Sequence, residues 1–172
     1  MGRDGEMLQR VDSANIACGF HAGDPLVMRQ TVAAAKRHDV SIGAHPSFPD
    51  LQGFGRRRID MAPAELEAMV VYQIGALQGI AAAEGHRVSH VKPHGALYNM
   101  AARQRPLADA IVRAMRAVDP ALMLFGLANS ELVRAARDAG VAVANEAFAD
   151  RGYLANGELA PRDAPGGVVS DV

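Results

Sequence analysis

The chain has 172 residues, of which 49% are hydrophobic and 22% are charged, and its formal net charge is -1. This composition predicts one globular domain over residues 1–172 and gives no electrostatic reason to expect nucleic acid or a membrane surface as a partner. The single cysteine, Cys18, excludes an internal disulfide. No signal-peptide pattern or uninterrupted membrane span is visible, so we expect a cytoplasmic protein.

The first strand-like run begins at Ser13, after a weak helical pattern over residues 1–12. Asn15 and His21 share the face of small and polar residues, whereas Ile16 and Cys18 share the apolar face. We therefore expect Cys18 to be a small core residue. Asp24 and Pro25 then suit the N-cap and first position of a helix that extends to about residue 38.

The second strand, residues 40–45, repeats this arrangement and ends in His45. The loop after it, residues 46–60, holds three arginines and is either a functional loop or a flexible turn. Later patterns predict helices over 63–84, 107–118 and 129 or 130 to 140, and strands over 88–92, 122–126 and 141–146. Alternating strands and helices predict a parallel sheet of right-handed βαβ units.

Chemically active side chains follow the ends of several predicted strands. Parallel α/β proteins place their sites beyond the carboxyl ends of the strands, so these side chains are expected to meet there. They are His21, His45, Lys92, His94 and Glu146. A further histidine, His90, lies in mid-strand and is expected to be a hydrogen-bonded interior residue.

Two chemistries fit this set of residues. Neutral imidazoles with a carboxylate are typical of a site for zinc or another divalent metal. Alternatively, a histidine acts as general base and Lys92 stabilises developing negative charge, unless Lys92 is only an ion-pair partner of Glu146 or Asp24. Tyr98 and Asn99 either orient a substrate or begin a helix with Tyr98 packed inward.

Longer strings of residues resemble a known family. They are residues 13–25, Gly43-Ala44-His45-Pro46-Ser47 with Asp50, Gly53-Phe54-Gly55-Arg56, Tyr72-Gln73, Lys92-Pro93-His94-Gly95-Ala96-Leu97-Tyr98-Asn99 and Glu146-Ala147-Phe148-Ala149-Asp150-Arg151. Together they closely resemble the LamB/YcsF family, which contains the A subunit of bacterial 5-oxoprolinase. The resemblance covers nearly the whole chain.

The resemblance implies a (β/α)7 barrel of the glycoside hydrolase/deacetylase type. It also implies ATP-dependent opening of the 5-oxoproline lactam to L-glutamate, performed by an A subunit together with B and C subunits. Family members begin with an additional acidic strand and continue beyond Asp171-Val172, and a complete barrel needs roughly 250 residues. We therefore expect this chain to be a barrel truncated at both ends.

The candidate residues lie inside the matching motifs, but the hypothesis about their roles rests on their positions at the strand ends. The expected catalytic residues are His21, Asp24, Lys92 and Glu146, and the expected metal ligands are His21, His45 and His94. The expected substrate-binding residues are Arg56, Tyr98, Asn99, Asp150 and Arg151. In this hypothesis the histidine cluster serves the hydrolytic half of the reaction, and Lys92 and Arg56 stabilise phosphate charge.

Two other functions remain open at this level. One is a stand-alone metal-dependent deacetylase or amidohydrolase that needs no ATP. The other is a metabolite-binding subunit without catalytic activity, whose histidines only shape a site for a partner. The family resemblance favours the ATP-dependent lactam hydrolase over both.

Overall fold

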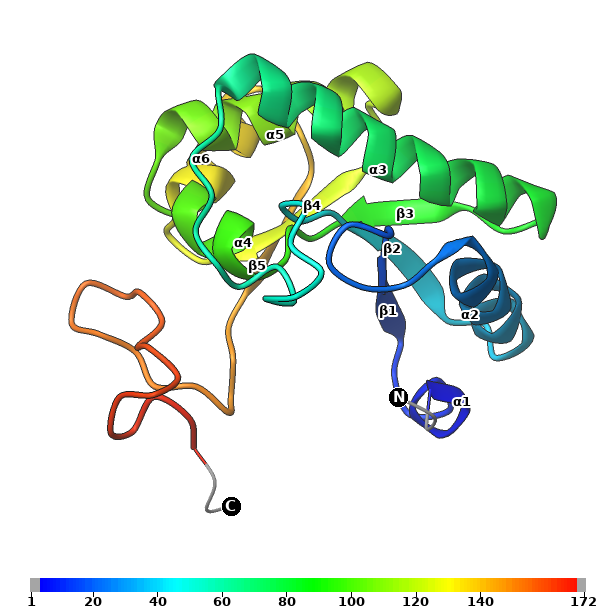
Figure 1. Ribbon diagram of the computed structural model, residues 1–172, viewed down its shortest axis with the longest axis horizontal. Coiled ribbons are helices and arrows are strands. Elements are labelled where there is room, and N and C mark those ends of the chain that lie inside the picture. Colours follow the sequence, from blue (N-terminus) through cyan, green and yellow to red (C-terminus); the bar gives the residue numbers. More distant parts are fainter. Residues whose placement is uncertain (1–3, 170–172) are drawn as a thin grey trace.

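A parallel sheet of five strands forms the centre of the computed structural model, which describes residues 4–169 (Figure 1). The strands lie in the order β1-β2-β3-β4-β5, the same order as in the sequence. Their bounds are β1 (Ser13–Ala17), β2 (Ser41–His45), β3 (Val88–Val91), β4 (Met123–Leu127) and β5 (Val143–Glu146). The predicted α/β class and parallel sheet are confirmed.

The helices are α1 (Asp4–Met7), α2 (Pro25–Arg37), α3 (Pro63–Ala83), α4 (Gly95–Ala101), α5 (Arg105–Val118) and α6 (Glu131–Asp138). Right-handed connections that always step to the next strand keep their helices on one face of the sheet. In agreement, α2 packs against α3, α3 against α5, and α5 against α6. Helices α2, α3, α5 and α6 therefore form one layer along the sheet.

Three helices end in the same backbone arrangement. The residues Asp39, Gly85 and Gly140 adopt positive φ immediately after the caps of α2, α3 and α6. After α6, the Val141 N–H donates to the carbonyl of Ala136 at 2.8 Å, which completes a Schellman motif. Because Val141 belongs to this helix end, β5 begins at Val143 rather than at the predicted position 141.

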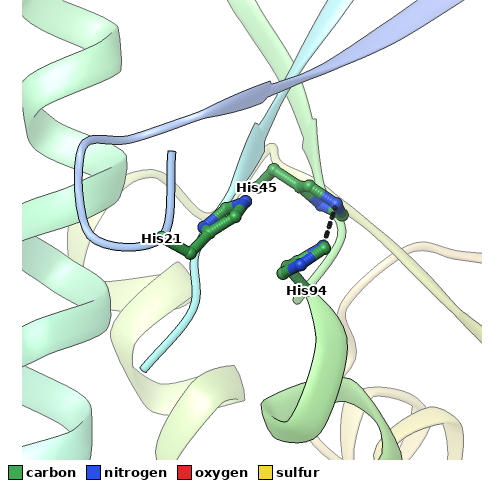
Figure 2. Close-up of side chains that lie close together, drawn as sticks. All are labelled: His21, His45 and His94. Carbon is green, nitrogen blue, oxygen red and sulfur yellow. Dashed lines mark hydrogen bonds between the residues drawn. The ribbon is translucent and has the colours of Figure 1, made fainter. Parts of the chain in front are cut away.

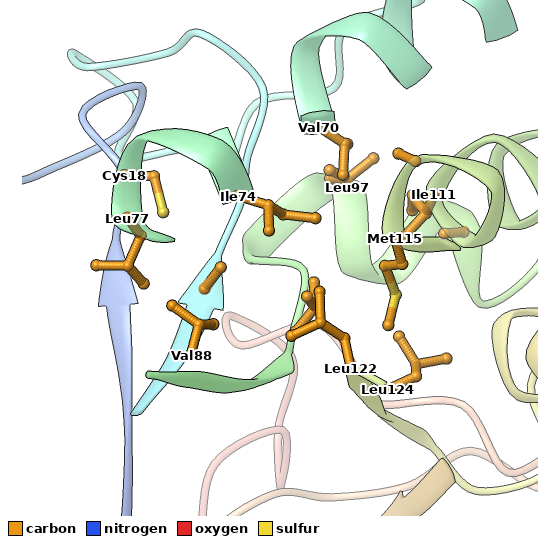
Figure 3. Close-up of a cluster of buried hydrophobic side chains, with 14 of the residues drawn as sticks. Cys18, Val70, Ile74, Leu77, Val88, Leu97, Ile111, Met115, Leu122 and Leu124 are labelled. Carbon is orange, nitrogen blue, oxygen red and sulfur yellow. The ribbon is translucent and has the colours of Figure 1, made fainter. Parts of the chain in front are cut away.

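The main core lies between the sheet and the helix layer (Figure 3). Strand residues such as Ile42 and Leu124 are fully buried there against helix residues such as Ile74 and Ile111. Cys18 is also in this core, 3% exposed, as predicted. Burial of this apolar area is the main favourable contribution to folding.

Helix α3 is, among residues 4–169, the one helix that is long and apolar enough by length and composition to match a membrane span. Its side chains Leu66, Val70, Ile74 and Leu77 are fully buried within the protein. Its contacts with α2, α5 and the sheet are those of a central core helix.

The other face of the sheet carries polar and small residues together with the aromatic Phe125. His90 is 2% exposed, and its ring lies across Gly43, where an added Cβ would be 2.2 Å from the imidazole. The ring contacts Asn15 Oδ1 through Nε2 at 3.2 Å and stacks on Phe125 with centroids 4.2 Å apart. The prediction that His90 is an interior hydrogen-bonded residue is confirmed.

The segment after β5 leaves the sheet as loops, drawn orange to red in Figure 1. Two isolated antiparallel bridges, between Arg151 and Val168 and between Tyr153 and Leu159, hold these loops together. Within the described residues, which end at 169, no helix follows residue 150.

Candidate functional site

Three histidines meet beyond the carboxyl ends of the strands (Figure 2). His45 is the last residue of β2, His21 follows β1 by a short loop, and His94 follows β3 at the N-cap of α4. The rings of His21 and His94 are stacked, with centroids 4.0 Å apart and an interplanar angle of 9°. His94 Nδ1 and His45 Nε2 are 3.0 Å apart.

Backbone carbonyls determine the tautomers of two of these rings. A carbonyl oxygen only accepts, so each ring nitrogen that contacts one must carry the proton. His45 Nδ1 donates to the carbonyl of Lys92, and His94 Nε2 donates to the carbonyl of Phe54 at 2.8 Å. In the neutral rings, the two nitrogens that face each other, His45 Nε2 and His94 Nδ1, therefore both carry lone pairs.

The histidines are held in their neutral form. Burial, followed by the charge of His94, lowers the pKa of His21 to about 4. Burial lowers the pKa of His45 to about 3, and burial also lowers the pKa of His94. Near neutral pH, both rings are therefore unprotonated at the facing nitrogens, and no proton bridges the two lone pairs.

One nitrogen of the third histidine has no partner. His21 Nδ1 is buried and makes no hydrogen bond to a described residue, and the same holds for the nearby Ser47 Oγ. Leaving a buried polar atom unpaired costs on the order of 1–3 kcal/mol, so such an atom normally has a further partner, such as an ion or an ordered water.

These observations fit a divalent transition-metal ion. His21, His45 and His94 each offer a ring nitrogen, and these atoms lie within 4.8 Å of one another. Neutral imidazoles with fixed tautomers, oriented by backbone carbonyls, are typical ligands of zinc and related ions. The cluster could hold such an ion through its two facing lone pairs and the unpartnered His21.

The loop that covers the cluster is held by two buried polar side chains. Asp50, 1% exposed, accepts hydrogen bonds from Gly53 N at 3.0 Å and Arg57 Nε at 2.7 Å. Gln73, fully buried on α3, binds the backbone of Ser47 twice, to its N–H and to its carbonyl, both at 2.9 Å. The loop is therefore an anchored part of the site, not a flexible turn.

Two glycines allow this loop to lie close to the histidines. Gly55 has φ +68°, and an added Cβ would be 2.2 Å from Ser47 Oγ and 2.8 Å from the His94 ring. Gly95 has φ +58°, and its Cβ would be 2.3 Å from the Gly55 carbonyl, which accepts from Ala96 N at 2.8 Å. Both positions require glycine for conformation and for space.

A second group of polar side chains lies beside the histidines. Lys92 Nζ forms an ion pair with Glu146, so of the two partners considered, Glu146 is the observed one. Tyr98 OH donates to the other oxygen of Glu146 at 3.0 Å, and Lys92 Nζ lies 4.8 Å from the centre of the Phe148 ring. Burial and Glu146 raise the pKa of Tyr98, which keeps its hydroxyl protonated and able to donate.

These two groups border one cavity of about 590 Å³. This is a volume typical of small-molecule sites. Seven residues expected in the site line it: His45, Arg56, Lys92, His94, Tyr98, Asn99 and Arg151. His21 and Glu146 are not in the cavity wall, but they contact His94 and Lys92, which are.

Two expected residues have other positions. Asp24 caps α2, accepting from Leu26 N at 2.8 Å and Val27 N at 2.9 Å, which is the capping role that the sequence also suggested. Asp150 is exposed, and its carbonyl accepts from Val169 N at 2.9 Å. Neither side chain lines the cavity.

Other residues of the site were not singled out from the sequence. Gln73 belonged to the string Tyr72-Gln73 that resembles the family, but no role was expected for it, and its amide on a buried helix face was the available signal. Arg103 and Arg162 line the cavity, but they lie in a helix end and a loop with no recognisable pattern.

A parallel α/β fold with its polar site beyond the strand ends defines the class of this protein. The whole chain, residues 1–172, matches the LamB/YcsF family, and the chain belongs to that family.

Its relatives include the A subunit of 5-oxoprolinase from Bordetella pertussis, 58% identical over 100% of this chain and 68% of the relative. The corresponding A subunit from Bacillus subtilis is 57% identical over 98% of this chain and 66% of the relative. A lactam utilization protein from Thermus thermophilus has a crystal structure that matches with a TM-score of 0.94 and 50% identity, over 99% of this chain and 69% of that one.

Proposed function

We propose that this chain acts in the ATP-dependent hydrolysis of the 5-oxoproline lactam to L-glutamate, as an A subunit working with B and C subunits. The relatives named as 5-oxoprolinase A subunits and as a lactam utilization protein support this substrate class. The complete fold is proposed to be a (β/α)7 barrel of the glycoside hydrolase/deacetylase type. The sequential strand order and single helix layer support that proposal.

The observation that carries the catalytic part is the convergence of three neutral histidines beside the cavity. An amide carbonyl is a poor electrophile, and phosphorylation of its oxygen by ATP would make the ring carbon reactive. One water oxygen then adds to that carbon and the C–N bond breaks, with its electron pair and a proton going to nitrogen. The acyl phosphate that remains is hydrolysed by a second water to glutamate and phosphate.

The side chains of the site have suitable properties for these steps. His45 Nε2 and His94 Nδ1 carry lone pairs and can hold or accept a proton from water. Lys92 supplies positive charge for the phosphate or the developing oxyanion, and Tyr98 holds Glu146 in place against it. If a divalent metal is held by His21, His45 and His94, it would occupy these lone pairs, and it would then polarise a carbonyl or activate water in place of the histidine base.

The test is glutamate release from 5-oxoproline by the full-length protein, with and without ATP and with and without its partner subunits. We expect release that requires both ATP and the partners. Turnover of an acetylated substrate without nucleotide would instead assign a stand-alone deacetylase. Binding of 5-oxoproline without turnover by the complete set of subunits would assign a metabolite-binding subunit.

A further inference from the structure

The cavity beside the histidines has a concentration of positive charge. Six cationic side chains line it, whereas none of its described lining residues is acidic. The whole chain has a net charge of only -1, so this is a local feature of the cavity. The six are Arg56, Arg58, Lys92, Arg103, Arg151 and Arg162.

Three of these cations have acidic partners. Lys92 pairs with Glu146, Arg103 with Glu158, and Arg58 with Asp60. Arg56 and Arg162 form no ion pair with any described residue. Within residues 4–169, no carboxylate oxygen therefore lies within ion-pair distance of either guanidinium group.

Arg151 lines the same cavity and interacts electrostatically with both of these unpaired charges. Its guanidinium donates to the carbonyls of Gly167 at 2.9 Å and Ala160 at 2.6 Å, which orients it without neutralising it. Burial lowers the pKa of Arg151, and the neighbouring charges of Arg162 and, less strongly, Arg56 lower it further, whereas Asp150 and Tyr153 oppose this shift only in part. Three guanidinium groups that repel one another across one cavity are stabilised when an anion binds among them.

We propose that this cavity is a phosphate-binding site, in which Arg56, Arg151 and Arg162 hold the phosphoryl group of a small molecule. Guanidinium groups match phosphate geometry through paired donors, and a dianion balances two unpaired arginines better than a single carboxylate does. His45 and His94 line the same cavity, so a group attached to that phosphate lies within reach of the histidine cluster.

This inference deepens the proposed function, because it assigns the phosphorylated form of the substrate, or the phosphates of ATP, to this chain rather than to one of its partners. The identity of the phosphorylated molecule depends on the proposed function. The anion site itself stands on the cavity and its unpaired arginines.

The test is calorimetric titration of the full-length protein with inorganic phosphate, and separately with ATP and with 5-oxoproline. We expect phosphate and ATP to bind and to compete with each other, with affinity that falls as salt rises. Tighter binding of ATP would assign the nucleotide as the source of the phosphoryl group. Binding of phosphate without measurable binding of ATP would assign the phosphorylated lactam or released phosphate.

Two arginine variants test whether phosphate binds in this cavity. Arg56→Gln and Arg162→Gln change exposed side chains, so we expect both to fold, and each should weaken phosphate binding by about tenfold or more. Arg87→Gln is the matched control, because Arg87 is also exposed but lies before β3, outside the cavity lining. Arg151 is unsuitable for this test because its side chain holds the backbone of the C-terminal loops.

The inference is overturned if phosphate and ATP both fail to bind the wild type, or if Arg56→Gln and Arg162→Gln bind phosphate as the wild type does. The experiments distinguish failure of the phosphate site from failure of the proposed function. Glutamate release without phosphate binding would remove only the phosphate site. Phosphate binding without ATP-dependent glutamate release would remove only the proposed function.

Discussion

His45 Nε2 and His94 Nδ1 face each other at 3.0 Å, and backbone carbonyls hold the proton of each ring on its other nitrogen. Two lone pairs at this distance repel each other unless a cation lies beside them. The low pKa values of the rings make a proton a poor candidate near neutral pH. From this arrangement we propose that a metal ion binds here, with His21 as the third ligand.

Cobalt binding tests this directly. We expect the full-length protein to bind Co²⁺ and give visible absorption bands of a nitrogen-ligated ion, because three imidazole nitrogens converge. His94→Ala should lose the bands, whereas His38→Ala, which changes the C-cap residue of α2 away from the cluster, should keep them. Equal spectra for the wild type and His94→Ala would exclude the cluster as the metal site.

Gly55→Ala should damage the histidine cluster. The added Cβ would be 2.2 Å from Ser47 Oγ and 2.8 Å from the His94 ring, in addition to the strain of a positive φ. We expect a loss of about 2–4 kcal/mol in the free energy of unfolding, measured by urea denaturation.

Gly140→Ala is the control for backbone strain alone. Gly140 also has positive φ, but its Cβ would meet nothing within 4 Å. We expect a loss of about 1 kcal/mol there. Equal losses in the two variants would show that close packing over His94 contributes nothing.

Gln73→Leu should loosen the loop over the site. The substitution leaves the N–H and carbonyl of Ser47 without their side-chain partners in a buried position. We expect a loss of about 2–4 kcal/mol by urea denaturation. Gln78→Leu, on the same helix at a half-buried position, should change stability far less, and a similar loss in both would contradict a specific clamp.

Asp50 should make the protein sensitive to acid. Hydrogen bonding to Arg57 lowers the pKa of Asp50 from 3.8 to about 2 in the folded state. A depressed folded pKa gives stability that is fully present above about pH 4 and is lost as the pH falls towards 2. The urea midpoint of the wild type should therefore fall through this range.

Asp50→Asn should have a lower midpoint at pH 7 and a flatter profile between pH 4 and 2. Asp60→Asn serves as the control, because the Asp60 side chain is 81% exposed in its pair with Arg58. A profile for Asp50→Asn as steep as that of the wild type would show that another carboxylate is responsible.

Local patterns in the sequence were sufficient for much of this fold. Alternating or continuous runs of apolar residues predicted all five strands, and the Asp24-Pro25 pair predicted the start of α2. The convergence of His21, His45 and His94 followed from a general rule, that parallel strands present their carboxyl ends at one edge of the sheet.

Contacts that depend on tertiary packing could not be predicted in the same way. The sequence left Lys92 with two candidate partners, and only the position of β5 relative to β3 brings Glu146 to it. The clamp between Gln73 and Ser47 joins residues 26 positions apart. Arg162 reaches the cavity because the loops after β5 turn back, and no periodic pattern marks that turn.

The most direct test of the account is ATP-dependent glutamate release from 5-oxoproline by the full-length protein assembled with its partner subunits. His45→Ala and His94→Ala are each compared with the wild type, with folding checked by circular dichroism. We predict that both variants lose at least about 100-fold in turnover, the usual contribution of a positioned acid-base or metal-binding group. Unchanged turnover in both variants would contradict the assignment of the histidine cluster as the catalytic site.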